Sequence, residues 1–262
     1  MNISISAIKL FKACRRAYYF KHIQKLEPVV RPEALETGKN YHALIEELYS
    51  DGSFTEDFSK ECAMAMAYKK YIYPKFKVTA VEEWKSHNIG SDLNLIGRVD
   101  GLAEDNALVE HKTTSSEITE EYEFNLLWDE QILTYMYLTG TRKVWYTVCR
   151  KPTIRQKKDE SDEEFFNRMV AWYDEDTDSK IRVLEITRTD EEVENFAKEL
   201  RIMASLMSIV NSGGENQFYK NTCHCNKWGR RCEYSSICLN YDPNQTYVEF
   251  TKGDNKNEPA ED

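Results

Sequence analysis

Two carboxylates and a lysine lie close together in the stretch from Ile96 to Ser116. Asp100 stands at the end of one expected strand, and Glu110 and Lys112 lie two positions apart in the next. Side chains alternate between the two faces of a strand, so Glu110 and Lys112 share a face and His111 points away from it. Carboxylates on neighbouring strands suit a hard cation such as Mg²⁺ or Mn²⁺, and a lysine beside them could orient or deprotonate a water molecule. The same pattern also fits an exposed strand that carries an ordinary Glu–Lys pair.

The elements that must position these residues follow from periodicity and turn signals. Apolar spacing predicts helices over residues 4–25, 33–49, 56–73, 124–138 and 190–210, and a short helix over 165–173. Runs of β-branched and aromatic residues predict strands over 77–85, 93–99, 107–113, 143–149 and 181–187. The turn-forming triplet Glu104, Asp105 and Asn106 joins two of these strands into a hairpin. This order predicts a mixed α/β domain, with a central mixed sheet flanked by helices.

Length and composition limit the class of protein. The chain has 262 residues, of which 31% are charged and 41% hydrophobic, as in folded soluble proteins. We expect a single domain over residues 1–250, with N-terminal helices over 1–75, a core over 76–210, a cysteine-rich segment over 211–242 and a disordered acidic tail over 251–262. No apolar run approaches the roughly 18 residues that cross a membrane, and the N-terminus lacks the features of a signal peptide. We therefore expect a cytoplasmic protein without a membrane partner.

The charge distribution bears on nucleic acids. A net charge of −10 argues against a uniformly basic DNA-binding protein but leaves room for a local basic groove. Basic residues cluster near the start of the chain, where Lys9, Lys12 and Arg16 have the spacing of one helix face, and again over residues 142–158. Either cluster fits a solvated surface or a phosphate-binding surface.

Three further residues complete a recognisable set. Gln131 and Tyr135 lie one helical turn apart in an expected helix, and His42 lies in another. The resulting motifs resemble, in order and rough spacing, those of the RecB-type nucleases of the PD-(D/E)XK superfamily. That signature consists of a glycine four residues before a histidine, then G-x-x-D, E-x-K and Q-x-x-x-Y. The matching pairs here are Gly38 with His42, Gly97 with Asp100, Glu110 with Lys112, and Gln131 with Tyr135.

The resemblance implies a restriction-endonuclease-like core and a role for each matching residue. His42, Asp100, Glu110 and the backbone carbonyl of His111 would hold Mg²⁺ or Mn²⁺, and Lys112 would be the catalytic lysine. Gln131 and Tyr135 would position the active site or the DNA strand.

The implied reaction is phosphodiester hydrolysis. The expected enzyme is an exonuclease that acts on single-stranded DNA or DNA ends in recombination, repair or replication. The sequence contains no G-x-x-x-x-G-K-[ST] loop, so we expect a helicase or recombination protein as partner. The alternatives are a non-catalytic DNA-binding recombination accessory protein and an RNA-processing nuclease.

Four of the seven cysteines fall within sixteen residues near the C-terminus. An odd number without a secretion signal argues against a disulfide framework. The arrangement resembles the CRISPR-associated exonucleases and AddB-type nucleases, which hold a [4Fe–4S] cluster with one cysteine before the core and three after it. The resemblance assigns Cys14, Cys225, Cys232 and Cys238 to the cluster, which would link the first helix to the C-terminal segment.

The third ligand is open to a second interpretation. The spacing of six residues between Cys225 and Cys232 departs from the usual two, and Cys223 competes with Cys225 for the same position. The alternative is a zinc knuckle formed by Cys223, Cys225, Cys232 and Cys238, with Cys14 free.

Overall fold

The computed structural model describes residues 1–30, 33–227 and 229–253. The chain forms two compact units, and three elements have residues in both: β3 (Val78–Gly90), β4 (Leu93–Ala103) and α9 (Asp190–Ser212). The terminal unit comprises the described residues of Met1–Arg31, Ser86–Gly97 and Glu194–Asp262. The sheet unit comprises those of Pro32–Lys85 and Arg98–Val193.

The sheet unit is built on a mixed sheet, as the sequence predicts. Its strand order is β4, β5 (Leu108–Thr114), β6 (Lys143–Arg150) and β7 (Ile181–Thr187), and β3 pairs with β4. β5 runs antiparallel to β4 and parallel to β6, and β7 runs antiparallel to β6. The parallel β5–β6 pair needs a long crossover. Helices α5 (Glu120–Leu126) and α6 (Glu130–Thr139) supply it.

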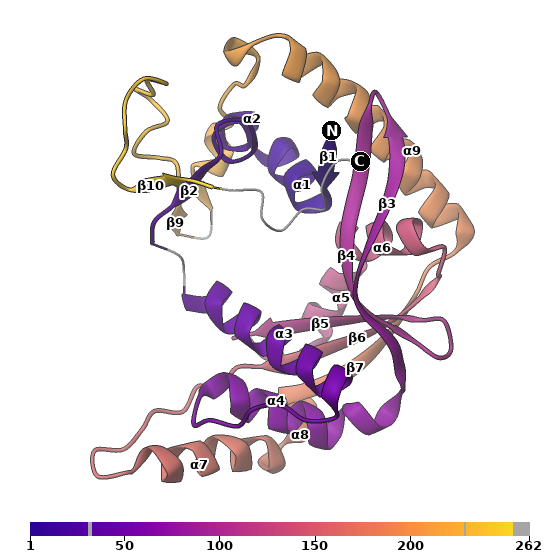
Figure 1. Ribbon diagram of the computed structural model, residues 1–262, viewed down its shortest axis with the longest axis vertical. Coiled ribbons are helices and arrows are strands. Elements are labelled where there is room, and N and C mark those ends of the chain that lie inside the picture. The colour runs from indigo at the N-terminus through magenta and orange to yellow at the C-terminus, as the bar shows by residue number, and fades with distance from the viewer. Residues whose placement is uncertain (31–32, 228, 254–262) are drawn as a thin grey trace. The chain divides into compact units, whose positions relative to one another are not determined.

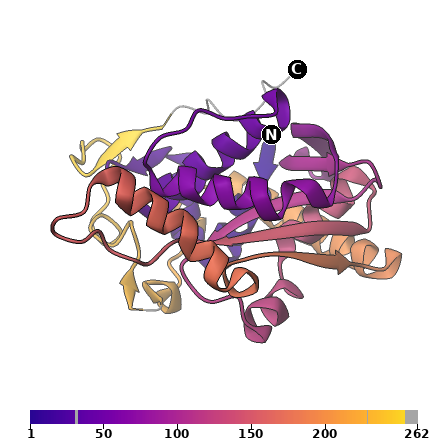
Figure 2. The ribbon, with the colours of Figure 1, turned by 90° about the horizontal axis from the view of Figure 1, so that it is seen from below.

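Helices of the sheet unit cover both faces of its strands. On one face lie α3 (Glu33–Asp51), α4 (Lys60–Tyr71), the 3-10 turn η2 (Tyr73–Lys75), α7 (Asp162–Glu175) and the short α8 (Thr177–Lys180). Figure 1 shows α3 and α4 on one side of β5, β6 and β7, and in Figure 2 they lie with α7 on the near side of the strands. Tyr41 and Tyr68 lie in the core on this face, and Ile132 and Met136 of α6 lie in the core on the other. The sheet is therefore covered on both faces.

The terminal unit joins the two ends of the chain. Its first part contains β1 (Asn2–Ser4), α1 (Ile5–Ala13), α2 (Arg15–Tyr18), the π-helix η1 (Tyr19–Ile23) and β2 (Leu26–Pro28). After α9 come η3 (Glu215–Gln217), η4 (Thr222–His224), β8 (Asn226–Lys227), β9 (Arg230–Arg231) and β10 (Phe250–Lys252). β10 pairs antiparallel with β2, and β1 runs parallel to residues 94–96 of β4. No helix of the described ranges is long and apolar enough to cross a membrane.

Two expected helices are wrong in their extent. The helix expected over 4–25 is interrupted at Cys14, whose extended backbone, with φ −160° and ψ 109°, separates α1 from α2. The helix expected over 124–138 is two helices, because Thr119 and Asp129 each cap a separate N-terminus with their side chains. Short polar residues thus set boundaries that apolar periodicity alone does not reveal.

The expected tail over residues 251–262 begins too early. Thr251 and Lys252 belong to β10 and pair with Glu27 and Leu26. Residues 254–262 lie outside the described residues.

Candidate active site and metal centre

The β4–β5 hairpin places the two predicted carboxylates on neighbouring strands, although in the described part of the chain Glu110 is not within 4.8 Å of both His42 and Asp100. Gly101 pairs with Val109 across the hairpin, and the antiparallel register therefore sets Asp100 opposite Glu110. The backbone N–H of His111 donates a 2.7 Å hydrogen bond to Oδ2 of Asp100. β4 continues beyond Asp100 to Ala103, so this carboxylate lies within a strand and not at its end.

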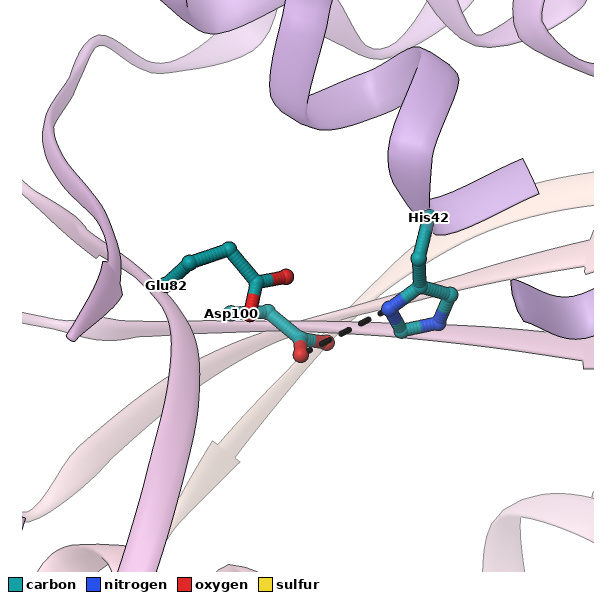
Figure 3. Close-up of side chains that lie close together, drawn as sticks. All are labelled: His42, Glu82 and Asp100. Carbon is teal, nitrogen blue, oxygen red and sulfur yellow. Dashed lines mark ion pairs between the residues drawn. The ribbon is translucent and has the colours of Figure 1, made fainter. Parts of the chain in front are cut away.

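His42 reaches the same place from α3. Its Nδ1 lies 3.6 Å from Oδ1 of Asp100, the ion pair drawn in Figure 3. Burial lowers the pKa of His42, but the interaction with Asp100, through both a hydrogen bond and its negative charge, outweighs burial, and the net pKa is raised. The side chain of His42 and the backbone of His111 therefore both lie next to the carboxylate of Asp100.

A chain of hydrogen bonds connects Glu110 to helix α6. The ammonium of Lys112 donates to Oε1 of Glu110 and, at 3.0 Å, to Oε1 of Gln131. The side-chain amide of Gln131 donates in turn to the hydroxyl of Tyr135 at 2.9 Å. Asp129 caps α6 by accepting the backbone N–H of Gln131 at 2.9 Å, which fixes where this helix begins. The four predicted residues from Glu110 to Tyr135 therefore form one connected network.

The side chain of His111 lies on the opposite face of β5, as predicted. It packs edge-on against the ring of Tyr68, and its Nδ1 lies 2.8 Å from the Thr147 hydroxyl. Burial lowers its pKa to about 3, so the ring is neutral. Only the backbone of His111 faces Asp100. Because the N–H and C=O of a strand residue point to the same side, its carbonyl is directed to that side too.

The pKa values of the two carboxylates are shifted in opposite directions. Burial would raise the pKa of Asp100, but the hydrogen bond from His42 and nearby positive charge lower it to about 2. Burial and repulsion from Asp100 raise the pKa of Glu110 to about 7. Burial would lower the pKa of Lys112, but the attraction of Glu110 raises it, so the ammonium stays protonated.

An unsatisfied oxygen at this site fits a cation. Glu110 is 2% exposed, and its Oε2 has no hydrogen-bond partner among the described residues. A buried carboxylate oxygen without a donor is costly, and a coordinated cation removes that cost. The donor set is oxygen-rich with one imidazole, which suits Mg²⁺ or Mn²⁺.

Glu82 is a candidate ligand that the sequence analysis missed. One ligand atom from each of His42, Glu82 and Asp100 lies within 4.8 Å of the other two, and Figure 3 shows Asp100 between the other two side chains. Burial and the charge of Asp100 raise the pKa of Glu82 to about 6, although Arg98 pairs with it at 2.7 Å. Glu82 has φ +54°, a conformation that is rare outside glycine. Neither this backbone turn nor the choice between Glu82 and Glu83 is visible in the sequence.

The four cysteines assigned to a cluster lie around one small pocket of the terminal unit. Cys14, Cys225, Cys232 and Cys238 all line it, and all seven cysteines of the chain are free. Cys14 is buried, and its sulfur accepts a 3.3 Å hydrogen bond from the backbone of Asn221. Burial raises the pKa of the Cys232 and Cys238 thiols, and the neighbouring Cys14 thiol adds to this rise.

Cys223, the rival of Cys225, differs from these four. Cys223 and Cys225 are both exposed, but only Cys225 belongs to the pocket lining. The carbonyl of Asn221 lies 3.8 Å from the sulfur of Cys225, whereas Cys223 contacts Asn221 through its backbone N–H.

The expected basic face of the first helix is wrong in one residue. The break at Cys14 removes Arg16 from the face of Lys9 and Lys12. Arg16 instead forms a 2.7 Å ion pair with Glu215. The charge of Arg16 is therefore paired within the terminal unit.

Comparisons with known proteins agree on the fold. The chain matches the sequence profile of the PD-(D/E)XK nuclease superfamily over residues 2–71 and 60–239. No curated protein matches it in sequence. A putative exonuclease from Eubacterium rectale is 13% identical, with a TM-score of 0.56 over 94% of this chain and 90% of the other. This likeness concerns the fold.

Two further solved structures have lower TM-scores. A phage-related exonuclease from Haemophilus somnus 129PT has 15% identity and a TM-score of 0.38, covering 77% of this chain and 96% of the other. The alkaline exonuclease of Laribacter hongkongensis has 13% identity and a TM-score of 0.35, covering 80% and 91%.

Proposed function

The chain belongs to the PD-(D/E)XK nuclease superfamily, and we propose that it is a cation-dependent exonuclease that hydrolyses phosphodiester bonds in single-stranded DNA or at DNA ends. The observation that carries this proposal is the buried Oε2 of Glu110, which lacks a partner among the described residues. It lies in a site that also holds Asp100 and a protonated Lys112. In a purely structural Glu–Lys pair, such an oxygen would be a cost without a return.

The residues that would hold the cation are His42, Asp100, Glu110 and the backbone carbonyl of His111. Glu82 is a further carboxylate within reach of His42 and Asp100. When bound, the cation supplies activation of water and neutralisation of charge on the phosphate.

The remaining residues act on the phosphate and on each other. Lys112 carries a fixed positive charge and donates hydrogen bonds, so it stabilises negative charge that develops in the transition state. Gln131 holds the Lys112 ammonium from the α6 side, and Tyr135 holds the Gln131 amide. Both helix residues therefore position Lys112 and are not required to touch the substrate.

A fold neighbour supports the choice of an exonuclease. The Eubacterium rectale protein that shares the fold is described as a putative exonuclease. An RNA-processing nuclease would use the same chemistry and is distinguished only by its substrate. A non-catalytic accessory protein has no need of a lysine held between Glu110 and Gln131. The sequence has no P-loop motif, so a helicase or recombination protein would supply unwound DNA.

We also propose that Cys14, Cys225, Cys232 and Cys238 hold a [4Fe–4S] cluster. All four line one pocket, whereas Cys223 does not. The zinc knuckle would require Cys223, so this lining favours the cluster.

The test is digestion of end-labelled nucleic acids of one sequence, supplied as single-stranded DNA, double-stranded DNA and RNA. We expect Mg²⁺ or Mn²⁺ to allow stepwise shortening of single-stranded DNA from an end, and a chelator of these ions to prevent it. Cleavage of RNA alone would select the RNA-processing alternative. Absence of cleavage of all three substrates with either cation would contradict the proposed activity.

A further inference from the structure

The terminal unit contains a second pocket, of about 520 Å³, that shares Cys14, Lys220 and Asn221 with the cysteine site. It forms where α1 joins α2, with residues 219–222 on one side and Met203 and Leu206 of α9 on another. Its volume lies within the roughly 300–1,000 Å³ typical of ligand sites. Nothing in the proposed hydrolysis uses this pocket.

The pocket is basic in an acidic protein. Lys12, Arg15 and Lys220 belong to its lining, and its lining in the described part of the chain includes no aspartate or glutamate. The chain as a whole carries a net charge of −10. Positive charge is therefore concentrated here against the overall balance, which favours an anionic ligand.

Aromatic rings hold the arginine in place. The guanidinium of Arg15 lies 5.1 Å from the ring centre of Phe11 and 4.7 Å from that of Tyr219. A cation–π contact uses the face of the guanidinium, whose N–H donors lie in its plane. Arg15 is thus fixed in position and can still donate to an anion.

Tyr219 is also open to a ligand. Its side chain remains 59% exposed although Arg15 covers part of the ring. Lys220 follows it in the chain and is exposed as well. An exposed ring next to fixed and mobile cations is the combination by which proteins bind single nucleic-acid strands, with bases on the ring and phosphates on the cations.

We infer that this pocket binds part of a single nucleic-acid strand, with a base stacked on Tyr219 and the neighbouring phosphates held by Arg15 and Lys220. The inference rests on the proposed function only in taking that strand to be the substrate. An acidic peptide would satisfy the cations but would gain nothing from the open face of Tyr219. A free phosphate would likewise depend on the cations alone.

The test is the fluorescence anisotropy of a labelled single-stranded oligodeoxynucleotide of about 12 nucleotides, titrated with the intact protein without added divalent cation. We expect Tyr219→Ala to weaken binding by roughly 5- to 100-fold, the range that base stacking supplies. Lys220→Ala should reduce the slope of log affinity against log salt by about 0.7, which corresponds to one lost phosphate contact.

Two control variants isolate these contacts. Tyr219→Phe keeps the ring and should bind as the parent does. Lys198→Ala removes an exposed lysine of α9 outside the pocket, where Lys198 contacts Asn195, and should change neither affinity nor slope. Unchanged thermal melting verifies that each variant is folded.

Three results would overturn the inference. The first is parental affinity in both Tyr219→Ala and Lys220→Ala. The second is a polyglutamate peptide whose binding depends on Tyr219 as strongly as that of DNA. The third is a parent protein that does not bind the oligonucleotide. Tyr219-dependent binding by a protein that cleaves nothing would support the pocket and contradict the nuclease proposal, so the two failures are distinguishable.

Discussion

At the scale of single residues, Glu110 is the residue that a bound cation would stabilise most. In the metal-free protein, burial and Asp100 raise its pKa from 4.5 to about 7. The folded state therefore holds this proton more tightly than the unfolded state. The contribution of Glu110 protonation to the free energy of unfolding therefore falls as pH rises from about 4.5 to about 7. A cation needs the ionised carboxylate, so its stabilising effect grows over the same interval.

We therefore predict that Mn²⁺ raises the melting temperature more at about pH 8 than at about pH 6. The raised pKa of His42 adds to this trend, because its protonated ring cannot bind a cation. Glu110→Gln should reduce the difference between the melting-temperature shifts at the two pH values without removing it. Equal shifts at both pH values in the parent would contradict the role given to Glu110.

Lys112 has a different role, since its ammonium contacts Glu110 and Gln131 and is not a ligand. We expect Lys112→Ala to lower kcat by about 100- to 1,000-fold, as for loss of a group that stabilises transition-state charge. Calorimetry should show Mn²⁺ affinity retained within a few-fold. Lys198→Ala, which removes an exposed lysine of α9, should leave both quantities unchanged. Loss of Mn²⁺ binding in Lys112→Ala would instead make this lysine part of the ion's support.

At the scale of elements, the hairpin that carries Asp100 and Glu110 depends on close packing beside the site. A Cβ at Gly101 would lie 3.1 Å from Val78 and 3.3 Å from the backbone oxygen of Ala80, whereas one at Gly38 would meet only Thr113, at 3.6 Å. Gly101→Ala should therefore lower the free energy of unfolding by about 1–3 kcal/mol. Gly38→Ala should raise it by up to about 1 kcal/mol, because alanine favours the helix. Urea unfolding measures both, and a stabilising Gly101→Ala would contradict this packing.

The sequence predicted which helices and strands form better than it predicted the residues at which they begin and end. Strand β7 has the predicted bounds, and the turn after Ala103 joins β4 to β5 as its residue types indicate. The break at Cys14 escaped prediction because apolar spacing continues through it. Glu82 escaped because its approach to Asp100 depends on a local turn of β3 and on pairing between strands, which no short motif encodes. The motif residues were predicted from the resemblance to the RecB-type nucleases, whose motifs this chain matches in order and rough spacing.

At the scale of the whole chain, the cysteine pocket joins segments that are more than 200 residues apart in sequence. Closing so long a loop is worth several kcal/mol in an entropic model, about 5 kcal/mol for a covalent link. We predict that the anaerobically purified protein is brown and that Cys14→Ala removes the colour and lowers the melting temperature. Cys225→Ser should have the same effect, and Cys223→Ser should not. A colourless parent with one zinc ion, unaffected by Cys14→Ala, would support the knuckle.

The central claim is that one cation site, built on Asp100, performs the hydrolysis. Its most direct measurement is the rate at which purified Asp100→Ala shortens end-labelled single-stranded DNA with Mg²⁺ or Mn²⁺, beside the parent and Asp159→Ala. Asp159 is an exposed carboxylate in the loop before α7 and serves as the matched control. We predict that the parent and Asp159→Ala cleave equally, and that Asp100→Ala is inactive while its visible spectrum matches that of the parent. Cleavage by Asp100→Ala at the rate of the parent would contradict the proposed site.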